Sequence, residues 1–290
     1  MTMRERFYAL AGAALEDDER VAIVLAAIGA GAIPEHPRLY DVGIREQLMI
    51  GVAAGLALEG YRPVAHSYAT FLIERPWEQI KLDLSHNDLG AVLVSNGASY
   101  DDSRSGRTHH APEDVALLAT LPGWRIEVPG HPDELERSFA RALRGNDRVY
   151  VRTSLEENHA PVPDDGLVVL RRASRPGPLV LAVGPTLAPT LAATADLDVD
   201  LAYLTTVRPF PRIELRTALA GRDEVALIEP YLAGTSAAEV GAALADRRHR
   251  VLAIGIENPE LRRYGTPGEH RAAHGLDARG IRARLERFLG

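Results

Sequence analysis

The 290-residue sequence contains no cysteine, which excludes disulfide bonds, thiolate metal sites and cysteine nucleophiles. Long apolar runs are missing as well, and none approaches the roughly 20 residues that a bilayer-spanning helix needs. The N-terminal segment also lacks the long apolar region and the cleavage site of a secretory signal. We therefore expect a cytoplasmic protein.

Basic residues are in the minority, with 33 lysines and arginines against 40 acidic residues and a net charge of −7. This balance excludes the basic footprint that marks nucleic-acid-binding proteins. The hydrophobic content of 46% and the charged content of 25% are ordinary for a globular protein. A chain of this length buries a sizeable core without covalent staples, and its length favours two domains.

Short apolar runs rich in β-branched residues alternate with segments of helical spacing in the first half of the chain. We expect buried strands at 21–27, 91–95, 125–128 and 149–152, and helices at 44–58, 76–85, 112–121 and 132–143. Proline opens three of these helices, where its missing N–H costs nothing. The alternation predicts an α/β fold with a doubly wound sheet.

A loop-like stretch over residues 156–178, rich in proline and charged residues, marks the expected domain boundary. Strand and helix patterns then restart and close with a helix near 278–289. We therefore predict two α/β domains, 1–158 and 165–290.

The first polar motif runs from Asp41 to Glu46 and is followed by small residues at 51, 53, 54 and 55. Glu46 falls near the N-terminus of the expected helix, where the helix dipole favours a carboxylate. The small residues would let this helix approach another backbone closely. A solvated first-turn glutamate, with glycines used for packing, is the alternative interpretation.

The second motif begins with two aromatic residues, Tyr68 and Phe71, and continues through Arg75 to Trp77. The two aromatic residues are three positions apart and could line one wall of a pocket for a flat ring. Ordinary core aromatics are the alternative interpretation.

The third motif is a polar loop that runs from Ser105 through Thr108, His109 and His110 into a proline-initiated helix. Adjacent histidines cannot easily ligate one metal ion together, and no third ligand is evident nearby, so we expect no metal in this loop. Catalytic or substrate-contacting histidines and surface histidines both remain as interpretations.

Taken in this order, the three motifs closely resemble the pyrimidine-binding domain of transketolases, and also the related deoxyxylulose-phosphate synthases and 2-oxoacid dehydrogenase β-subunits. The second half resembles the transketolase C-terminal domain, best over 180–185, 225–229, 254–259, 264–269 and 275–277. The resemblance covers nearly the whole chain. It implies a pyrimidine-binding domain with a parallel sheet and a C-terminal-like domain with a mixed sheet.

The resemblance also implies thiamine diphosphate as the cofactor. Glu46 would hydrogen-bond the N1′ nitrogen of the aminopyrimidine and so activate the cofactor, whose own chemistry is the demanding part. Tyr68, Phe71 and Arg75 would contact the cofactor, with Phe71 as the stacking side chain. His109 would face the substrate and assist proton transfer.

The neighbouring substrate contacts implied by the resemblance are Ser105, Thr108, His110 and Arg152. Several positions depart from the family pattern, because Ser105 replaces a usual aspartate, Gly97 a phosphate-contacting histidine, and Leu155 an arginine. Each lost charge-assisted donor should weaken phosphate binding by roughly 1.5–3 kcal/mol. Either the substrate is not the usual sugar phosphate, or other groups such as Arg104 or Arg107 bind the phosphate.

Thiamine enzymes hold Mg²⁺ and the diphosphate on a Gly-Asp-Gly motif and a downstream asparagine. No Gly-Asp-Gly occurs in this sequence, and the Asp164-Asp165-Gly166 run is better interpreted as a turn. We therefore expect a partner, an N-terminal-type transketolase subunit that carries the diphosphate-binding domain, in an α2β2 assembly. A large apolar interface would use the small-residue helix after Glu46.

The expected activity is the transfer of a two-carbon ketol unit from a ketose to an aldehyde. One alternative is a 2-oxoacid dehydrogenase β-like or acyloin-forming subunit. Another is a non-catalytic regulatory homologue that keeps the fold.

Overall fold

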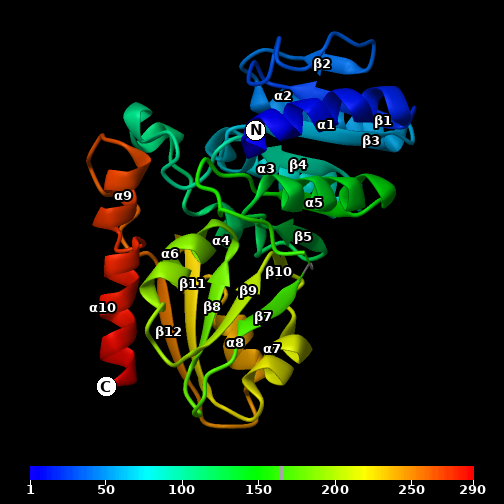
Figure 1. Cartoon of the computed structure of the whole chain (residues 1–290). Helices are drawn as coiled ribbons and strands as arrows, with labels where there is room; N and C mark the ends of the chain where they lie inside the picture. Colours follow the sequence, from blue (N-terminus) through cyan, green and yellow to red (C-terminus); the bar gives the residue numbers. More distant parts are fainter. Residues whose placement is uncertain (164–165) are drawn as a thin grey trace.

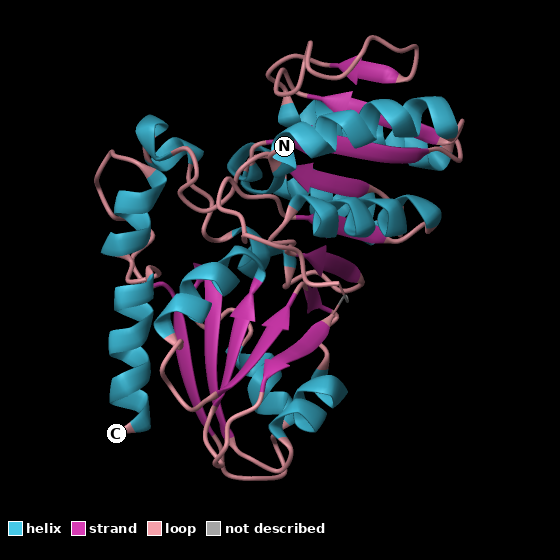
Figure 2. Ribbon diagram, viewed as in Figure 1, coloured by secondary structure: helices cyan, strands magenta, loops and turns pink. Residues whose placement is uncertain are grey.

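The computed structural model of the chain describes residues 1–163 and 166–290. The turn expected at Asp164 and Asp165 lies outside these residues. The described chain forms two β-sheets, each flanked by helices, and Figures 1 and 2 show the two α/β units one above the other. The predicted α/β fold class is confirmed.

The first sheet has the strand order β10-β5-β6-β4-β3-β1-β2, and all its pairings are parallel except that of β10 with β5. Its strands are β1 (Val21–Leu25), β2 (Leu39–Asp41), β3 (Arg62–Ser67), β4 (Val92–Ser95), β5 (Trp124–Glu127), β6 (Arg148–Val151) and β10 (Thr206–Arg208). Every residue of β1, β3 and β4 is buried. A parallel sheet of this kind is covered on both faces, which explains its continuous apolar runs.

Helices α1 (Met3–Asp17) and α5 (Pro132–Arg144) pack together on one face of this sheet. Thr2 and Glu5 form a capping box that starts α1, and Pro132 occupies the first turn of α5 as predicted. The opposite face is covered by α2 (Glu46–Leu58) and by the segments that follow β3 and precede β5. This second face carries the predicted motifs.

The segment after β3 does not form the regular helix predicted at 76–85. It contains the π-helix η1 (Thr70–Glu74), the short helix α3 (Trp77–Gln79) and the π-helix η2 (Ile80–His86). The amide of Arg75 donates to the carbonyl of Thr70 at 3.1 Å, an i to i−5 bond. Wide turns of this kind occur often at functional sites, and this one directly precedes Arg75.

The polar loop after β4 contains the 3₁₀ turns η3 (Ser103–Ser105) and η4 (Arg107–His109). The helix predicted at 112–121 is shorter than expected and forms α4 (Asp114–Leu118).

The second sheet has the order β12-β11-β8-β9-β7, with β7 as an antiparallel edge strand. Its strands are β7 (Leu167–Arg171), β8 (Leu179–Val183), β9 (Asp200–Leu204), β11 (Glu224–Leu232) and β12 (Arg250–Ile256). The accompanying helices are η5 (Gly184–Thr186), α6 (Leu187–Ala193), α7 (Arg212–Leu219), α8 (Ala237–Ala243), α9 (Pro267–Ala273) and α10 (Ala278–Leu289). The predicted mixed sheet is therefore present.

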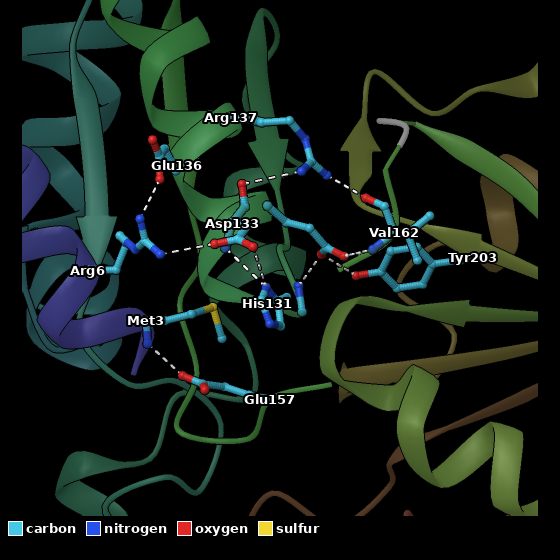
Figure 3. A network of polar contacts seen from close by, with 11 residues as sticks. Met3, Arg6, His131, Asp133, Glu136, Arg137, Glu157, Val162 and Tyr203 are labelled. Atoms are coloured by element: carbon cyan, nitrogen blue, oxygen red, sulfur yellow. Dashed lines mark hydrogen bonds and ion pairs between the residues drawn. The ribbon is translucent and has the colours of Figure 1, made fainter. Parts of the chain in front are cut away.

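The two halves are joined by more than the connecting loop. Strand β10 lies in the second half of the sequence but pairs with β5 of the first sheet. The carboxylate of Glu134 on α5 accepts from the Tyr203 hydroxyl at 2.6 Å and from the amide of Val162 at 2.8 Å. Figure 3 shows this junction, where Arg137 also donates to the Val162 carbonyl at 2.5 Å. Buried polar contacts thus attach the second half of the chain to the first half.

Across residues 1–163 and 166–290, no helix is long and apolar enough to cross a bilayer.

Candidate functional site

Glu46 is the first residue of α2, and its side chain is only 2% exposed. Its Oε1 accepts a hydrogen bond from Nη1 of Arg75 at 2.6 Å, so the carboxylate is both buried and paired. The positive end of the α2 dipole also favours negative charge at this place. The structure therefore does not support the interpretation of Glu46 as a solvated first-turn residue.

An aromatic wall stands beside this carboxylate. The Arg75 guanidinium lies over the ring of Phe71 at 4.1 Å, so Arg75 contacts both Glu46 and Phe71. The Tyr68 ring approaches Phe71 edge-on at 6.2 Å. Both aromatic side chains are only partly buried, which leaves their rings accessible and separates them from ordinary core aromatics.

His109 completes the cluster from the polar loop. Its ring is 4.9 Å from Phe71 and 5.9 Å from Tyr68, in edge-on arrangements with both. The Thr108 hydroxyl lies 3.0 Å from His109 Nδ1, which leaves Nε2 as the nitrogen for another partner. We call Glu46, Tyr68, Phe71, Arg75 and His109 the ring cluster. It joins a buried carboxylate, two aromatic rings and an imidazole, a set suited to a flat ring that bears nitrogen.

Ser105 and His110 lie outside the ring cluster although they belong to the same loop. The exposed Ser105 hydroxyl donates to Asp102 at 3.0 Å. His110 is 5% exposed and packs edge-on against His270 at 5.1 Å. Burial lowers the pKa of His110 to about 4. The two adjacent histidines thus face different surroundings.

Arg152 does not join the ring cluster either. Its side chain is 1% exposed, pairs with Asp114 at 2.7 Å and donates to the Ser99 hydroxyl at 2.6 Å. The guanidinium also lies 5.3 Å from the Tyr231 ring, at the contact between the two sheets. A buried guanidinium with these partners has a structural role, so the expected substrate contact is not supported for Arg152.

Of the two arginines considered as phosphate ligands, Arg107 is engaged within the chain. It donates to Glu113 at 2.6 Å, to Glu260 at 2.9 Å and to the His110 carbonyl at 3.1 Å. Arg104 is exposed on η3. Arg104 therefore remains a candidate ligand for the phosphate group, whereas Arg107 does not.

Arg4, which the sequence argument missed, also reaches the ring cluster. It lies in the first turn of α1 and donates to Asn96 Oδ1 at 2.5 Å and to the Tyr68 hydroxyl at 3.5 Å. Asn96 is 92 positions away along the chain. No local pattern distinguishes Arg4 from Arg6 of the same helix, so only the packing of α1 identifies it.

Glu74 is a second residue that was missed, although it lies within the second motif. Its Oε2 accepts from the Thr70 hydroxyl at 3.0 Å, while its buried Oε1 has no partner in the described part of the chain. Burial raises the pKa of Glu74 to about 7. Its burial follows from the π-helical turn, which periodicity did not predict.

Among the described residues, no group of three or more histidine or acidic side chains could hold a metal ion. The sequence adds no cysteine ligands.

The first half of the chain matches a known sequence family. The family described as "Transketolase, pyrimidine binding domain" matches residues 2–158, which contain every member of the ring cluster.

Two curated relatives cover nearly all of the chain. The "Uncharacterized 33.6 kDa protein in fasciation locus" of Rhodococcoides fascians is 46% identical over 287 residues, which are 96% of this chain and 91% of that protein. The 1-deoxy-D-xylulose-5-phosphate synthase 2 of Geobacter sulfurreducens is 33% identical over 300 residues, which are 93% of this chain and 46% of that protein. The chain thus spans about half the length of the synthases that it matches.

Solved structures share the whole architecture. A chain described as "Split gene transketolase, inactive beta4 tetramer" superposes with a TM-score of 0.83 at 22% identity and covers 100% of this chain and 98% of that one. A transketolase from Campylobacter jejuni gives a TM-score of 0.76 at 15% identity, with 99% of this chain and 46% of that chain covered. At these identities the likeness establishes the fold alone.

Proposed function

This chain belongs to the transketolase family, and from that premise we propose that it is the subunit that activates the aminopyrimidine of thiamine diphosphate for ketol transfer. The observation that carries the proposal is the buried Glu46 carboxylate beside the Phe71 ring, with His109 at the ring's edge. Each element of this arrangement has a separate task in such a reaction.

The donor set fits the pyrimidine end of the cofactor. Glu46 is only 2% exposed. A ring nitrogen can therefore share a proton with its carboxylate without competition from water. The flat guanidinium of Arg75 already lies over the face of the Phe71 ring, 4.1 Å from its centroid. When bound, the cofactor would supply the carbon nucleophile that amino-acid side chains lack.

Arg75 covers the face of Phe71 on which the cofactor ring would stack. Its guanidinium lies over Phe71 and holds Glu46 Oε1 at 2.6 Å. For a ring to stack on that face of Phe71, the guanidinium must move aside and Glu46 must exchange one partner for another. Arg75 therefore holds the Glu46 carboxylate in place until the ring arrives.

His109 would hold or move a proton at a substrate oxygen. Thr108 fixes the ring through Nδ1 at 3.0 Å, so Nε2 is the nitrogen left for the substrate. An imidazole with one nitrogen held and the other free is the usual arrangement of a general acid or base. The exposed hydroxyl of Thr108 and that of Ser105 lie on the same loop and would add substrate contacts.

A partner subunit is supported by what the surface of α2 exposes. The residues at 48, 51, 55 and 58 form one stripe on α2, in which Leu48 is 48% and Leu58 71% exposed. Ile44, two residues before the helix, is 75% exposed and extends this surface. A stripe of large apolar side chains and glycines, beginning beside Glu46, is suited to burial against another subunit. This surface would place the diphosphate-binding subunit next to the carboxylate.

We assign Mg²⁺ and the diphosphate mainly to that partner, because this chain has neither Gly-Asp-Gly nor a metal-binding group among its described residues. The similar solved chain is described as an inactive β4 tetramer of a split-gene transketolase. By analogy we expect this chain alone to be inactive and the working enzyme to be an α2β2 assembly, located in the cytoplasm as the sequence suggests.

A second candidate function has one observation in its favour. The relatives named 1-deoxy-D-xylulose-5-phosphate synthases are 30–33% identical, above the 15% identity of the structurally similar Campylobacter jejuni transketolase. A deoxy product implies a two-carbon unit that lacks the terminal hydroxyl, so the donor would be a 2-oxo acid and the enzyme would form an acyloin. Release of CO₂ from a 2-oxo acid separates this candidate from ketose-dependent ketol transfer.

Reconstitution tests the proposal. The chain is mixed with a Gly-Asp-Gly-bearing subunit, thiamine diphosphate and Mg²⁺, and is supplied with a ketose donor and an aldehyde. We expect turnover only when both subunits are present, and a Glu46→Gln chain that assembles but is inactive. Turnover by this chain alone, or full turnover with the Glu46→Gln chain, would contradict the proposal.

A further inference from the structure

The segment between β12 and α10 leaves the second sheet and lies against the first domain. We call residues 257–277, which include α9, the C-terminal strap. Figure 1 shows this segment in orange beside the turn that carries η3 and η4. The strap therefore contacts the loop over residues 103–110, which carries His109 of the ring cluster.

Polar contacts attach the strap to this loop and to its base. Glu260 accepts from Arg107 Nε at 2.9 Å, and the Gly265 carbonyl accepts from the Ser103 hydroxyl at 2.8 Å. Farther along, Arg271 donates to Glu156 at 3.0 Å. Three separate points of the strap are thus bonded to the first domain.

Close packing reinforces the attachment where the loop bends. Gly106 has a φ of +75°, and a Cβ added there would lie 2.8 Å from the Tyr264 ring. Tyr264 is itself 73% exposed, so its ring covers the bend of the loop from the solvent side. A larger residue at position 106 would displace the tyrosine.

Buried imidazoles form the third attachment. His270 on α9 is 1% exposed and lies edge-on to His110 at 5.1 Å, and the Tyr100 ring stacks on His270 at 5.8 Å and on His274 at 5.6 Å. Among the described residues, the ring nitrogens His110 Nε2, His270 Nδ1 and His270 Nε2 are buried without partners. Buried imidazoles without partners pack best as neutral rings.

We propose that the C-terminal strap is a positioning device for His109, with His270 as its principal positioning residue. This inference rests on the proposed function, because it assigns the strap a purpose in substrate chemistry.

The backbone explains how the strap reaches His109 without touching it. The His109 amide donates to the Gly106 carbonyl at 3.0 Å, and the His110 amide donates to the Arg107 carbonyl at 3.1 Å. His109 thus lies in a single tight turn between Gly106, under Tyr264, and His110, against His270. Fixing both ends of the turn fixes the imidazole, and small displacements of a catalytic group are costly to rate.

The groups that face the imidazoles come from several elements. Asp102 and Arg107 lie on the loop, and Arg263 and Glu269 lie on the strap. Glu156 lies near Tyr100 from the end of the first domain. No three of the histidine and acidic groups are placed to hold a metal ion within the part of the chain that the structure describes, so packing is the role left to the imidazoles.

Hydrogen–deuterium exchange on the isolated chain tests the inference without any assay of activity. We expect the amides of the peptide over 103–110 to exchange about tenfold faster in His270→Ala and in Tyr264→Ala than in the parent chain. The exposed His249 directly precedes β12 and lies outside the strap, so His249→Ala should leave the loop unchanged. Because Tyr264 is exposed, its variant keeps the test valid even where His270→Ala loses stability.

The assembled enzyme gives a second measurement. We expect Tyr264→Ala to lower kcat about tenfold while the Kd of thiamine diphosphate stays unchanged, because the strap contacts neither Glu46 nor Phe71. Unchanged exchange of the 103–110 amides in both strap variants would overturn the inference. Faster exchange in an assembly without ketol transfer would contradict the proposed function and leave the strap's control of the loop standing.

Discussion

Two adjacent histidines, His109 and His110, lie in contrasting environments. His109 belongs to the partly exposed ring cluster, where Glu46 and Arg75 are paired at 2.6 Å. His110 belongs to a buried group with His270 and Tyr100, in which several ring nitrogens have no partner. A reaction needs charged groups that have partners and a ring that is accessible. Packing between two domains needs buried, neutral rings, and these can lack hydrogen-bond partners.

The contrast shows why residue type alone could not separate the two histidines. Both are preceded by polar residues, both lie in one loop, and they are adjacent in the sequence. Their difference comes from the strap, which covers one side of the loop and leaves the other open. The ring cluster should therefore be sensitive to chemical changes, and the strap cluster to changes in packing.

Replacement of Glu46 should have the largest effect. Glu46→Gln keeps the shape of the side chain but removes the carboxylate that, under the proposed function, would share the ring proton, so we expect kcat to fall roughly 10³-fold. Assembly and thermal stability should change little, because Arg75 is partly exposed and can turn to water. Steady-state kinetics with size-exclusion chromatography measures both. A loss of assembly that matches the loss of turnover would mean that Glu46 has only a structural role.

Replacement of each histidine in turn tests the contrast directly. His109→Asn should lower kcat about 10²-fold with little change in stability, because an imidazole that moves a proton is lost. His110→Asn should instead lower the free energy of unfolding by about 1–3 kcal/mol, because a polar amide enters a buried apolar space. Kinetics and chemical denaturation of both variants supply the data. Equal losses of kcat and of stability in the two variants would contradict the contrast between His109 and His110.

Arg4 should have a smaller effect that depends on the substrate. Its guanidinium lies beside the Tyr68 hydroxyl at 3.5 Å, so it can attract an anionic donor to the ring cluster. Arg4→Gln should raise the KM of a phosphorylated donor about tenfold and leave that of a neutral donor within about twofold. Equal effects on both donors would show that Arg4 acts through Tyr68 and Asn96 only.

Acid should weaken the packing between the strap and the loop that it contacts. Burial lowers the pKa of His110 and of His274 from 6.5 to about 4, so the unfolded chain takes up these protons first. Their contribution to stability is complete above pH 6.5 and is lost as the pH falls toward 4. Glu156 opposes this trend, because burial raises its pKa to about 7 and its contribution is lost as the pH rises.

A paired comparison isolates the histidine contribution from that of Glu156. His274→Phe keeps a ring stacked on Tyr100 but cannot take up a proton. We expect the Tm of the parent chain to fall relative to that of His274→Phe as the pH is lowered from about 7 to about 5. A Tm difference that stays constant over this range would show that His274 does not contribute to acid sensitivity.

Much of the fold followed from periodicity. The strand expected at 91–95 is β4 and the helix expected near 278–289 is α10, because each combines an apolar pattern with clear boundaries. Strand β10 was not predicted, since three residues carry no pattern and their pairing with β5 is a long-range contact. The π-helical turn at Thr70–Glu74 was missed because a wide turn has no simple period in the sequence.

The site divides in the same way. Glu46, Tyr68, Phe71, Arg75 and His109 were proposed because they lie within short motifs that resemble one family, and the structure brings them together. Arg152 was expected at the site because the resemblance implied it, whereas the structure shows it buried and bonded to Asp114 and Ser99 at the contact between the two sheets. Arg4 and the strap were missed because only the tertiary structure brings them to the loop. Local motifs indicate the candidate site residues, whereas the contacts that hold them in place depend on long-range packing.

Calorimetric titration of thiamine diphosphate with Mg²⁺ tests the central claim most directly. The titration is made into this chain, into a Gly-Asp-Gly-bearing subunit, and into their mixture with either the parent or the Glu46→Gln chain. We predict tight binding only to the two mixtures, with a smaller enthalpy when Gln replaces Glu46. Tight binding to this chain alone would contradict the assignment of the two ends of the cofactor to different subunits.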